Sequence, residues 1–137
     1  MDKQVLAEKV VDTMYSKDYF SQWLGIERVK VEPGQCVLKM QIRKEMLNGF
    51  GIAHGGIAYS LADTALAFAS NSHGRKSLSI ETSISHTESL KEGDMIIATA
   101  KEMNLSNKLG IYYITITRDG KTIALFKGTV YRTSIEW

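Results

Sequence analysis

The sequence predicts an α+β fold in which an antiparallel β-sheet wraps around one long central α-helix. The segment from His54 to about Asn71 has the alanine- and leucine-rich composition and the length of a helix. Its apolar residues lie on nearly all sides, which is typical of a helix that other elements enclose. Segments with strand character flank it, two before and four after. A curled antiparallel sheet is the arrangement that encloses the helix with this order of elements.

The length and composition of the chain indicate a single domain over residues 1–137. Hydrophobic residues make up 44% and charged residues 23%, which is typical of a globular protein with a core. The formal net charge of +2 is too small to indicate a nucleic-acid partner. The apolar part of the central helix is short and contains Ser, Asp and Thr, so we expect no membrane partner. Residues 1–4 are charged and no apolar signal sequence follows, so we expect a cytoplasmic location.

The part of the chain before the central helix predicts one helix and two strands. Apolar residues at helical spacing between Asp2 and Tyr15 predict an N-terminal helical segment within residues 1–18, which covers one edge or end of the domain. Between Leu24 and Arg43 the chain has strand character, interrupted by the turn signal Pro33-Gly34. These segments predict two strands joined by a turn.

Four more strands are predicted after the helix, at Ser77–Thr87, Met95–Met103, Leu109–Arg118 and Lys121–Arg132. The connections contain turn signals, of which Asp119-Gly120 is the strongest. Turns at such regular intervals indicate that the four strands form an antiparallel meander. On this prediction, the outer face of the sheet carries four apolar residues, namely Ile96, Ala98, Ile114 and Ile116. Because a second copy of the chain would bury them, we expect a homo-oligomer.

Asp63 is the only carboxylate between Glu45 and Arg75, and it lies near the middle of the central helix. A buried carboxylate is costly unless it is paired or hydrogen-bonded. The side chain could cap a loop or reach solvent where two subunits meet. It could equally be a group whose pKa is tuned for chemistry. The residues alone leave both interpretations open.

The start of the central helix is a second candidate site. His54-Gly55-Gly56 follows the glycine-rich segment Asn48–Gly51. The first amides of a helix have no internal acceptors, and they suit an anion or a carbonyl oxygen that gains negative charge. Alternatively, the glycines only make a tight entry turn, and the His54 and Asn48 side chains only hold the loop.

Several other chemistries are not indicated. His54, His73 and His86 are far apart in sequence, and we predict no metal site. We interpret His73 as a solvated residue past the helix end and His86 as a packed strand residue. The sequence contains no glycine-rich nucleotide-binding motif, so no cofactor is expected. Ser60 lies in the helix with no evident base, which disfavours a serine hydrolase.

The motif Asn48-Gly-x-Gly-x-x-His54-Gly55-Gly56, followed by Leu61-Ala62-Asp63-Thr64, resembles the PaaI-type acyl-CoA thioesterases of the hotdog fold. The segment Ala124–Gly128 fits the same family, and the resemblance extends from about Trp23 to Arg132. It implies a hydrolase that cleaves an acyl-CoA thioester. Coenzyme A is then part of the substrate and is no cofactor.

The resemblance also implies roles for individual residues. Asp63 corresponds to the catalytic carboxylate, acting as a general base on water or as a nucleophile. Gly55 and Gly56 correspond to the helix start that polarises the thioester carbonyl. The implied catalytic residues are Asp63, His54, Gly55 and Asn48, and the implied substrate-binding residues are Gly56, Thr64 and Ser79. Family sites form between two subunits of a homo-oligomer, commonly a homotetramer built as a dimer of dimers.

The resemblance leaves the acyl group open between an aryl (phenylacetyl-like) and a medium-chain group. Many relatives carry Arg-Pro in the loop where this chain has Glu88-Ser89-Leu90, so the coenzyme A contacts are also open. The main alternative is a hotdog protein that binds or senses acyl-CoA without catalysis. The Asp/His motif of hotdog dehydratases is absent from the sequence.

Overall fold

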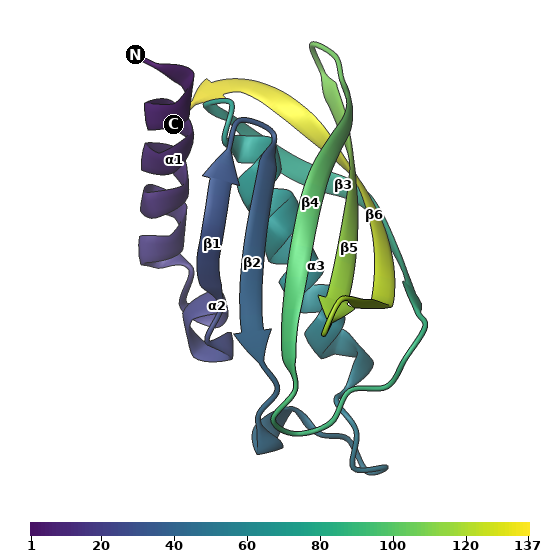
Figure 1. Cartoon of the computed structure of the whole chain (residues 1–137). Coiled ribbons are helices and arrows are strands. Elements are labelled where there is room, and N and C mark those ends of the chain that lie inside the picture. The colour runs from purple at the N-terminus through teal and green to yellow at the C-terminus, as the bar shows by residue number, and fades with distance from the viewer.

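The computed structural model describes all residues from 1 to 137 as a curved sheet that wraps around helix α3 (Figure 1). The predicted α+β fold with a central helix is confirmed. A one-turn 3₁₀ helix at Lys44–Met46 precedes the loop that leads into α3. The remaining elements are α1 (Lys3–Lys17), α2 (Tyr19–Leu24), β1 (Glu27–Glu32), β2 (Gln35–Gln41), α3 (Gly55–Asn71), β3 (Arg75–His86), β4 (Met95–Leu105), β5 (Leu109–Arg118) and β6 (Lys121–Glu136).

The six strands pair in the order β1-β2-β4-β5-β6-β3, and every pair is antiparallel. The predicted four-strand meander is therefore wrong for β3, which pairs with β6 at the edge of the sheet instead of with β4. Residues 87–94 are too long a connection for a tight hairpin, and they carry the chain from the β3 edge past the start of α3 to β4 (Figure 1). This crossing places the loop after β3 beside the N-terminus of α3.

The predicted outer face of β4 and β5 is also wrong. Ile96, Ala98, Ile114 and Ile116 are at most 1% exposed and belong to the core around α3. The outer face instead carries a different apolar set, with Ile97, Tyr113 and Leu125 between 38% and 51% exposed. Alternation with period two determines which residues share a face. It does not determine which face points inward when both faces carry apolar side chains.

Helix α3 is buried along most of its surface but leaves one stripe half-buried. The side chains toward the sheet include Leu61, Ala65 and Phe68, all without solvent exposure. The half-buried stripe contains Asp63 and Ala67, spaced one helical turn apart. Asp63 therefore lies at the margin of the core, and not in its centre as the all-round apolar pattern suggested.

The N-terminal helices cover the β1 side of the molecule. Helix α1 lies alongside β1 (Figure 1) and buries Ala7, Val10 and Val11. The short helix α2 was not predicted. Asp18 caps its N-terminus by accepting a hydrogen bond from the Ser21 N–H at 3.0 Å, and Gly25 ends it in the left-handed conformation.

We predict that Gly128→Ala destabilises the fold. Strand β6 passes α3 so closely at Gly128 that an added Cβ would lie 2.5 Å from Leu66 Cδ2. Because Leu66 is buried, the free energy of unfolding should fall by about 1–3 kcal/mol, measured by urea denaturation. At Gly49 an added Cβ meets no atom within 4 Å, so Gly49→Ala should change stability by less than about 0.5 kcal/mol. Unchanged stability of Gly128→Ala would contradict the prediction.

Candidate active site

Helix α3 begins directly after His54, whose side chain caps the helix and occupies one of the two backbone amides that were predicted to bind substrate. His54 Nδ1 accepts a hydrogen bond from the Gly56 N–H at 3.1 Å, and the His54 carbonyl accepts one from the Ile57 N–H at 2.9 Å. Nδ1 can accept only if it carries no proton. The Gly55 N–H has no acceptor in the protein. The helix start therefore offers one open amide, that of Gly55, whereas the resemblance implied both Gly55 and Gly56.

Asn48 holds the loop that leads into α3. Its Oδ1 accepts a hydrogen bond from the Phe50 N–H at 2.9 Å and a longer one from the Ile52 N–H at 3.4 Å. A short antiparallel bridge between Leu47 and Ala53 closes the same loop. The Asn48 carbonyl oxygen is thus occupied, and its side-chain amide nitrogen is the part that can still donate.

A cavity of about 340 Å³ opens at this helix start, here called the helix-start cavity. Asn48, His54 and Gly55 line it, and another part of its wall comes from the end of β3 and the loop after it. His86 belongs to that wall, and its Nε2 lies 3.4 Å from the place that a Cβ on Gly55 would take. A histidine beside the open amide was missed, because sequence reasoning placed His86 in sheet packing. Its position directly before a long connection was the available signal.

Asp63 lines a second cavity of about 320 Å³, here called the Asp63 cavity. Asp63 is the only carboxylate in its wall and Lys76 the only cation. Burial, and secondarily the negative charge of Asp18, raise the pKa of the Asp63 carboxyl, and no hydrogen bond lowers it. Ser79, an implied substrate-binding residue, lines the same cavity. The cavity therefore pairs a relatively basic carboxylate with largely apolar surroundings.

The two cavities share no lining residue. Gly55 and Asp63 are eight positions apart in α3, which corresponds to about 12 Å along the helix axis. A carbonyl oxygen bound at the Gly55 amide is therefore out of reach of the same chain's Asp63. In one chain the two groups therefore belong to separate cavities.

Thr64 lies in neither cavity. Its hydroxyl shares a hydrogen bond of 2.9 Å with Ser21 Oγ, which also donates to Asp18 Oδ2 at 2.6 Å. Thr64 is only 8% exposed, so in this chain its side chain attaches α3 to α2. Its implied role in substrate binding has no counterpart in the geometry of a single chain.

Other potential nucleophiles are already engaged or inactivated. The Ser60 hydroxyl donates to the Gly56 carbonyl at 2.7 Å. Cys36 is buried at 2% exposure, and burial raises the pKa of its thiol to about 12. A thiol with that pKa is almost entirely protonated near neutral pH and makes a poor nucleophile.

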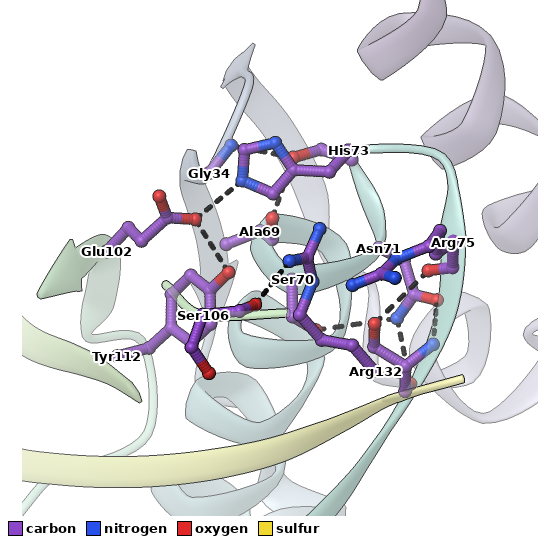
Figure 2. Close-up of polar contacts among 12 residues, drawn as sticks. Gly34, Ala69, Ser70, Asn71, His73, Arg75, Glu102, Ser106, Tyr112 and Arg132 are labelled. Carbon is purple, nitrogen blue, oxygen red and sulfur yellow. Dashed lines mark hydrogen bonds and ion pairs between the residues drawn. The ribbon is translucent and has the colours of Figure 1, made fainter. Parts of the chain in front are cut away.

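A polar cluster lies at the opposite end of α3, shown in Figure 2. Glu102 Oε2 accepts a hydrogen bond from Tyr112 Oη at 2.7 Å and lies 2.6 Å from His73 Nε2. His73 was predicted to be solvated, and this contact contradicts that interpretation. Nearby, Arg132 donates to the Ser106 carbonyl in the turn between β4 and β5 (Figure 2). His73, Glu102, Tyr112 and Arg132 line neither of the two cavities, so they take no part in the candidate site.

The comparisons with known proteins identify the class. The family model described as "Thioesterase superfamily" matches residues 50–125, more than half of the chain. The chain therefore belongs to the thioesterase superfamily, and the predicted class of thioester hydrolase is confirmed. The match includes the helix start, Asp63, the whole of β3, β4 and β5, and the first residues of β6.

Individual relatives indicate which type of thioesterase the chain resembles. A putative esterase of Archaeoglobus fulgidus is 42% identical over 133 residues, covering 96% of this chain and 86% of that protein. The acyl-coenzyme A thioesterase PaaI of Escherichia coli is 37% identical over 120 residues, covering 87% and 86% respectively. The solved structure of E. coli PaaI superposes with a TM-score of 0.96 at 33% identity, covering 98% of this chain and 99% of that one. The resemblance to PaaI-type hotdog thioesterases is confirmed.

Two further features concern membranes and metals. None of the helices has both the length and the apolarity needed to cross a membrane. Nowhere do three or more His, Cys, Asp or Glu side chains come together in a way that could hold a metal ion. The expected absence of a metal and of a cofactor stays a prediction.

We predict that Asp63→Asn raises stability at neutral pH. The pKa of Asp63 is raised in the folded chain, so the folded state binds this proton more tightly than the unfolded state. The free energy of unfolding therefore falls as pH rises from the ordinary aspartate pKa, about 3.9, through the raised pKa. Asn carries no charge and avoids this loss. The variant should have a higher Tm than the wild type at neutral pH, and the difference should vanish at low pH.

Thermal unfolding over a pH series measures this difference. Asp119→Asn in the exposed turn between β5 and β6 is the matched control and should leave Tm unchanged. A lower Tm for Asp63→Asn at neutral pH would show that the carboxylate stabilises the fold, contrary to this prediction.

Proposed function

We propose that this thioester hydrolase cleaves an acyl-CoA with an aryl (phenylacetyl-like) or medium-chain acyl group to the free acid and coenzyme A. The single observation that carries the proposal is the raised pKa of Asp63 in a largely apolar cavity of suitable size for an acyl group. The name of the E. coli relative adds support, since it is an acyl-coenzyme A thioesterase. The structure of that relative is described as a protein of the phenylacetic acid degradation operon. A cytoplasmic location, as expected from the sequence, fits this substrate.

In the proposed reaction, the Gly55 N–H donates a hydrogen bond to the thioester carbonyl oxygen at the positive end of the α3 dipole. Asp63 takes a proton from water as the water oxygen bonds to the carbonyl carbon. The carbon–sulfur bond then breaks, and the proton passes to the departing thiolate. Alternatively, Asp63 attacks the carbon itself to form a mixed anhydride, which water hydrolyses. Both routes need one amide and one carboxylate at the same carbonyl.

The remaining predicted residues have supporting roles in this proposal. His54 caps α3 and so aims the Gly55 amide at the cavity. The free amide nitrogen of Asn48 faces the substrate from the loop, while Ser79 lies on the Asp63 side and orients water or the acyl group. Gly56 admits the substrate to the backbone. Thr64 keeps Asp63 in place through its hydrogen bond to Ser21.

The two halves are joined by a second copy of the chain in this proposal. Strand β3 forms a free edge of the sheet, and its Leu78 and Ile80 are 67% and 61% exposed. An exposed apolar edge strand next to the Asp63 cavity favours pairing with another chain. The open amide of one chain and Asp63 of its partner would then serve one substrate. The assembly is a homodimer or a dimer of dimers.

The alternative is an acyl-CoA binding or sensing protein without catalysis. Such a protein needs the cavities and the open amide, but it has no use for a carboxylate with a raised pKa beside the acyl group. Turnover separates the two functions. A catalytic protein loses hydrolysis with Asp63, whereas a sensor retains its binding and response.

We predict that Gly55→Pro abolishes most of the activity without unfolding α3. Proline is well tolerated at the first helical position, and His54, with φ −57° and ψ 138°, already has the conformation favoured before proline. The substitution therefore removes the open N–H while keeping the helical backbone, and kcat should fall about 100- to 1,000-fold. Gly55→Ala is the matched control, since it adds a Cβ and keeps the amide. Both are assayed by thiol release from phenylacetyl-CoA and octanoyl-CoA, with circular dichroism as the check on folding. Equal activity of the two variants would contradict the role of the amide.

We predict that two inactive variants restore activity when mixed. Asp63→Asn and Gly55→Pro should each be inactive alone, and near-wild-type turnover of Asp63→Asn would refute the proposed catalytic role. Subunits are mixed in equal amounts and exchanged through mild denaturant. Half of the dimers should be mixed, and in each one of the two sites is intact, so about a quarter of the wild-type activity should return. No recovery after verified exchange would refute a site shared between two chains.

A further inference from the structure

The wall of the Asp63 cavity includes an aromatic side chain that the family resemblance did not reach. Trp137 follows β6 and lines the cavity together with Asp63. Apolar side chains from α1, α3, β3 and β6 complete the apolar part of the wall, namely Met14, Leu66, Ala67, Leu78 and Val130. The indole is thus one of the larger flat surfaces available to an acyl group bound beside Asp63.

The indole of Trp137 is held in a fixed orientation. Its Nε1–H donates to Asn71 Oδ1 at 2.9 Å, and its backbone N–H donates to the Gly74 carbonyl at 2.9 Å. The Lys76 ammonium lies 4.9 Å from the centre of the ring. These contacts come from the end of α3 and the start of β3, so the ring is attached to two rigid elements. A side chain fixed in this way loses little conformational entropy when a ligand binds.

Asn71, the anchor of the indole, is itself buried and fully hydrogen-bonded. It is 2% exposed. Its Oδ1 also accepts from the Ser77 N–H at 2.9 Å, and its Nδ2 donates to the Ala67 carbonyl at 2.9 Å and the Ser77 carbonyl at 3.1 Å. Because every polar atom of the amide has a partner, its orientation is determined. Trp137 is nevertheless 44% exposed, so part of its ring is not covered by this chain.

We propose that Trp137 is a specificity-determining residue, whose indole selects an aryl acyl group over a long alkyl chain in the Asp63 cavity. The inference rests on the proposed acyl-CoA hydrolysis and specifies its substrate class. An aryl ring gains an offset-stacked or edge-to-face contact with the indole. A flexible alkyl chain gains no such contact, and Trp137, as part of the wall, limits the space in the cavity.

The test compares kcat/KM for phenylacetyl-CoA and decanoyl-CoA in three variants. In Trp137→Ala, the ratio of the two values should fall about tenfold, since aromatic pairing is lost and space is opened. Trp137→Phe keeps a ring and should retain a ratio within about threefold of the wild type. Trp23→Ala is the matched control, because Trp23 is similarly exposed but lies in α2 outside the cavity. It should leave the ratio unchanged.

The kinetic outcomes separate this inference from the proposed function. An unchanged ratio in Trp137→Ala, or an equal loss for both substrates, would overturn the role in specificity while leaving the hydrolase intact. Failure of the wild-type protein to hydrolyse any acyl-CoA would overturn the proposed function instead.

A binding experiment tests the contact without turnover. The chain has two tryptophans, so the double variant Asp63→Asn/Trp23→Phe has Trp137 as its only one. Phenylacetyl-CoA should change the fluorescence of Trp137 saturably, and coenzyme A alone should not. Identical responses to both compounds would refute an aryl contact at Trp137.

Discussion

The fixed rise of an α-helix constrains everything that this site can do. Thioester hydrolysis needs a hydrogen-bond donor at the carbonyl oxygen and an attacking or activating group at the carbonyl carbon, within a few ångströms of each other. Here both groups belong to α3 but are eight positions apart, about 12 Å along the axis. No side-chain rotation closes that distance. The separation favours a reaction site that is completed by another chain, and the proposed function therefore requires that two chains assemble.

The environment of Asp63 shows how such a site keeps a basic carboxylate. Most of α3 is packed firmly into the sheet, and Gly128 of β6 comes into close contact with Leu66. That packing stabilises the helix independently of Asp63, so the unfavourable half-buried charge can be tolerated. Asp18, near the hydrogen-bonded pair Ser21 and Thr64, adds further negative potential. A carboxylate that lowers the stability of the folded chain and also lines a cavity is typical of a functional group.

Much of the fold could be predicted from the sequence, but its spatial order could not. The apolar length of α3 and the turn signals determined the element types and most of their bounds. Alternation left the inward face of β4 undetermined, because Ile96 and Ile97 point to opposite faces and both are apolar. The turn signals between successive strands also led to the prediction that β3 pairs with β4. The actual pairing of β3 with β6 depends on contacts between strands far apart in sequence, which no local pattern records.

In the candidate site too, some residues could be predicted from local sequence patterns, and others depend on contacts between distant parts of the chain. Asn48, His54 and Gly55 could be found because their roles arise within one loop and one helix start. The loss of Gly56 as a donor depends on which way the His54 ring turns, and that follows only from the packed structure. His86 lies at the end of β3 and Trp137 follows β6, and only the curvature of the assembled sheet brings them to α3. The groups proposed for catalysis are therefore local features of the sequence, whereas the cavity walls proposed to select a substrate depend on the tertiary fold.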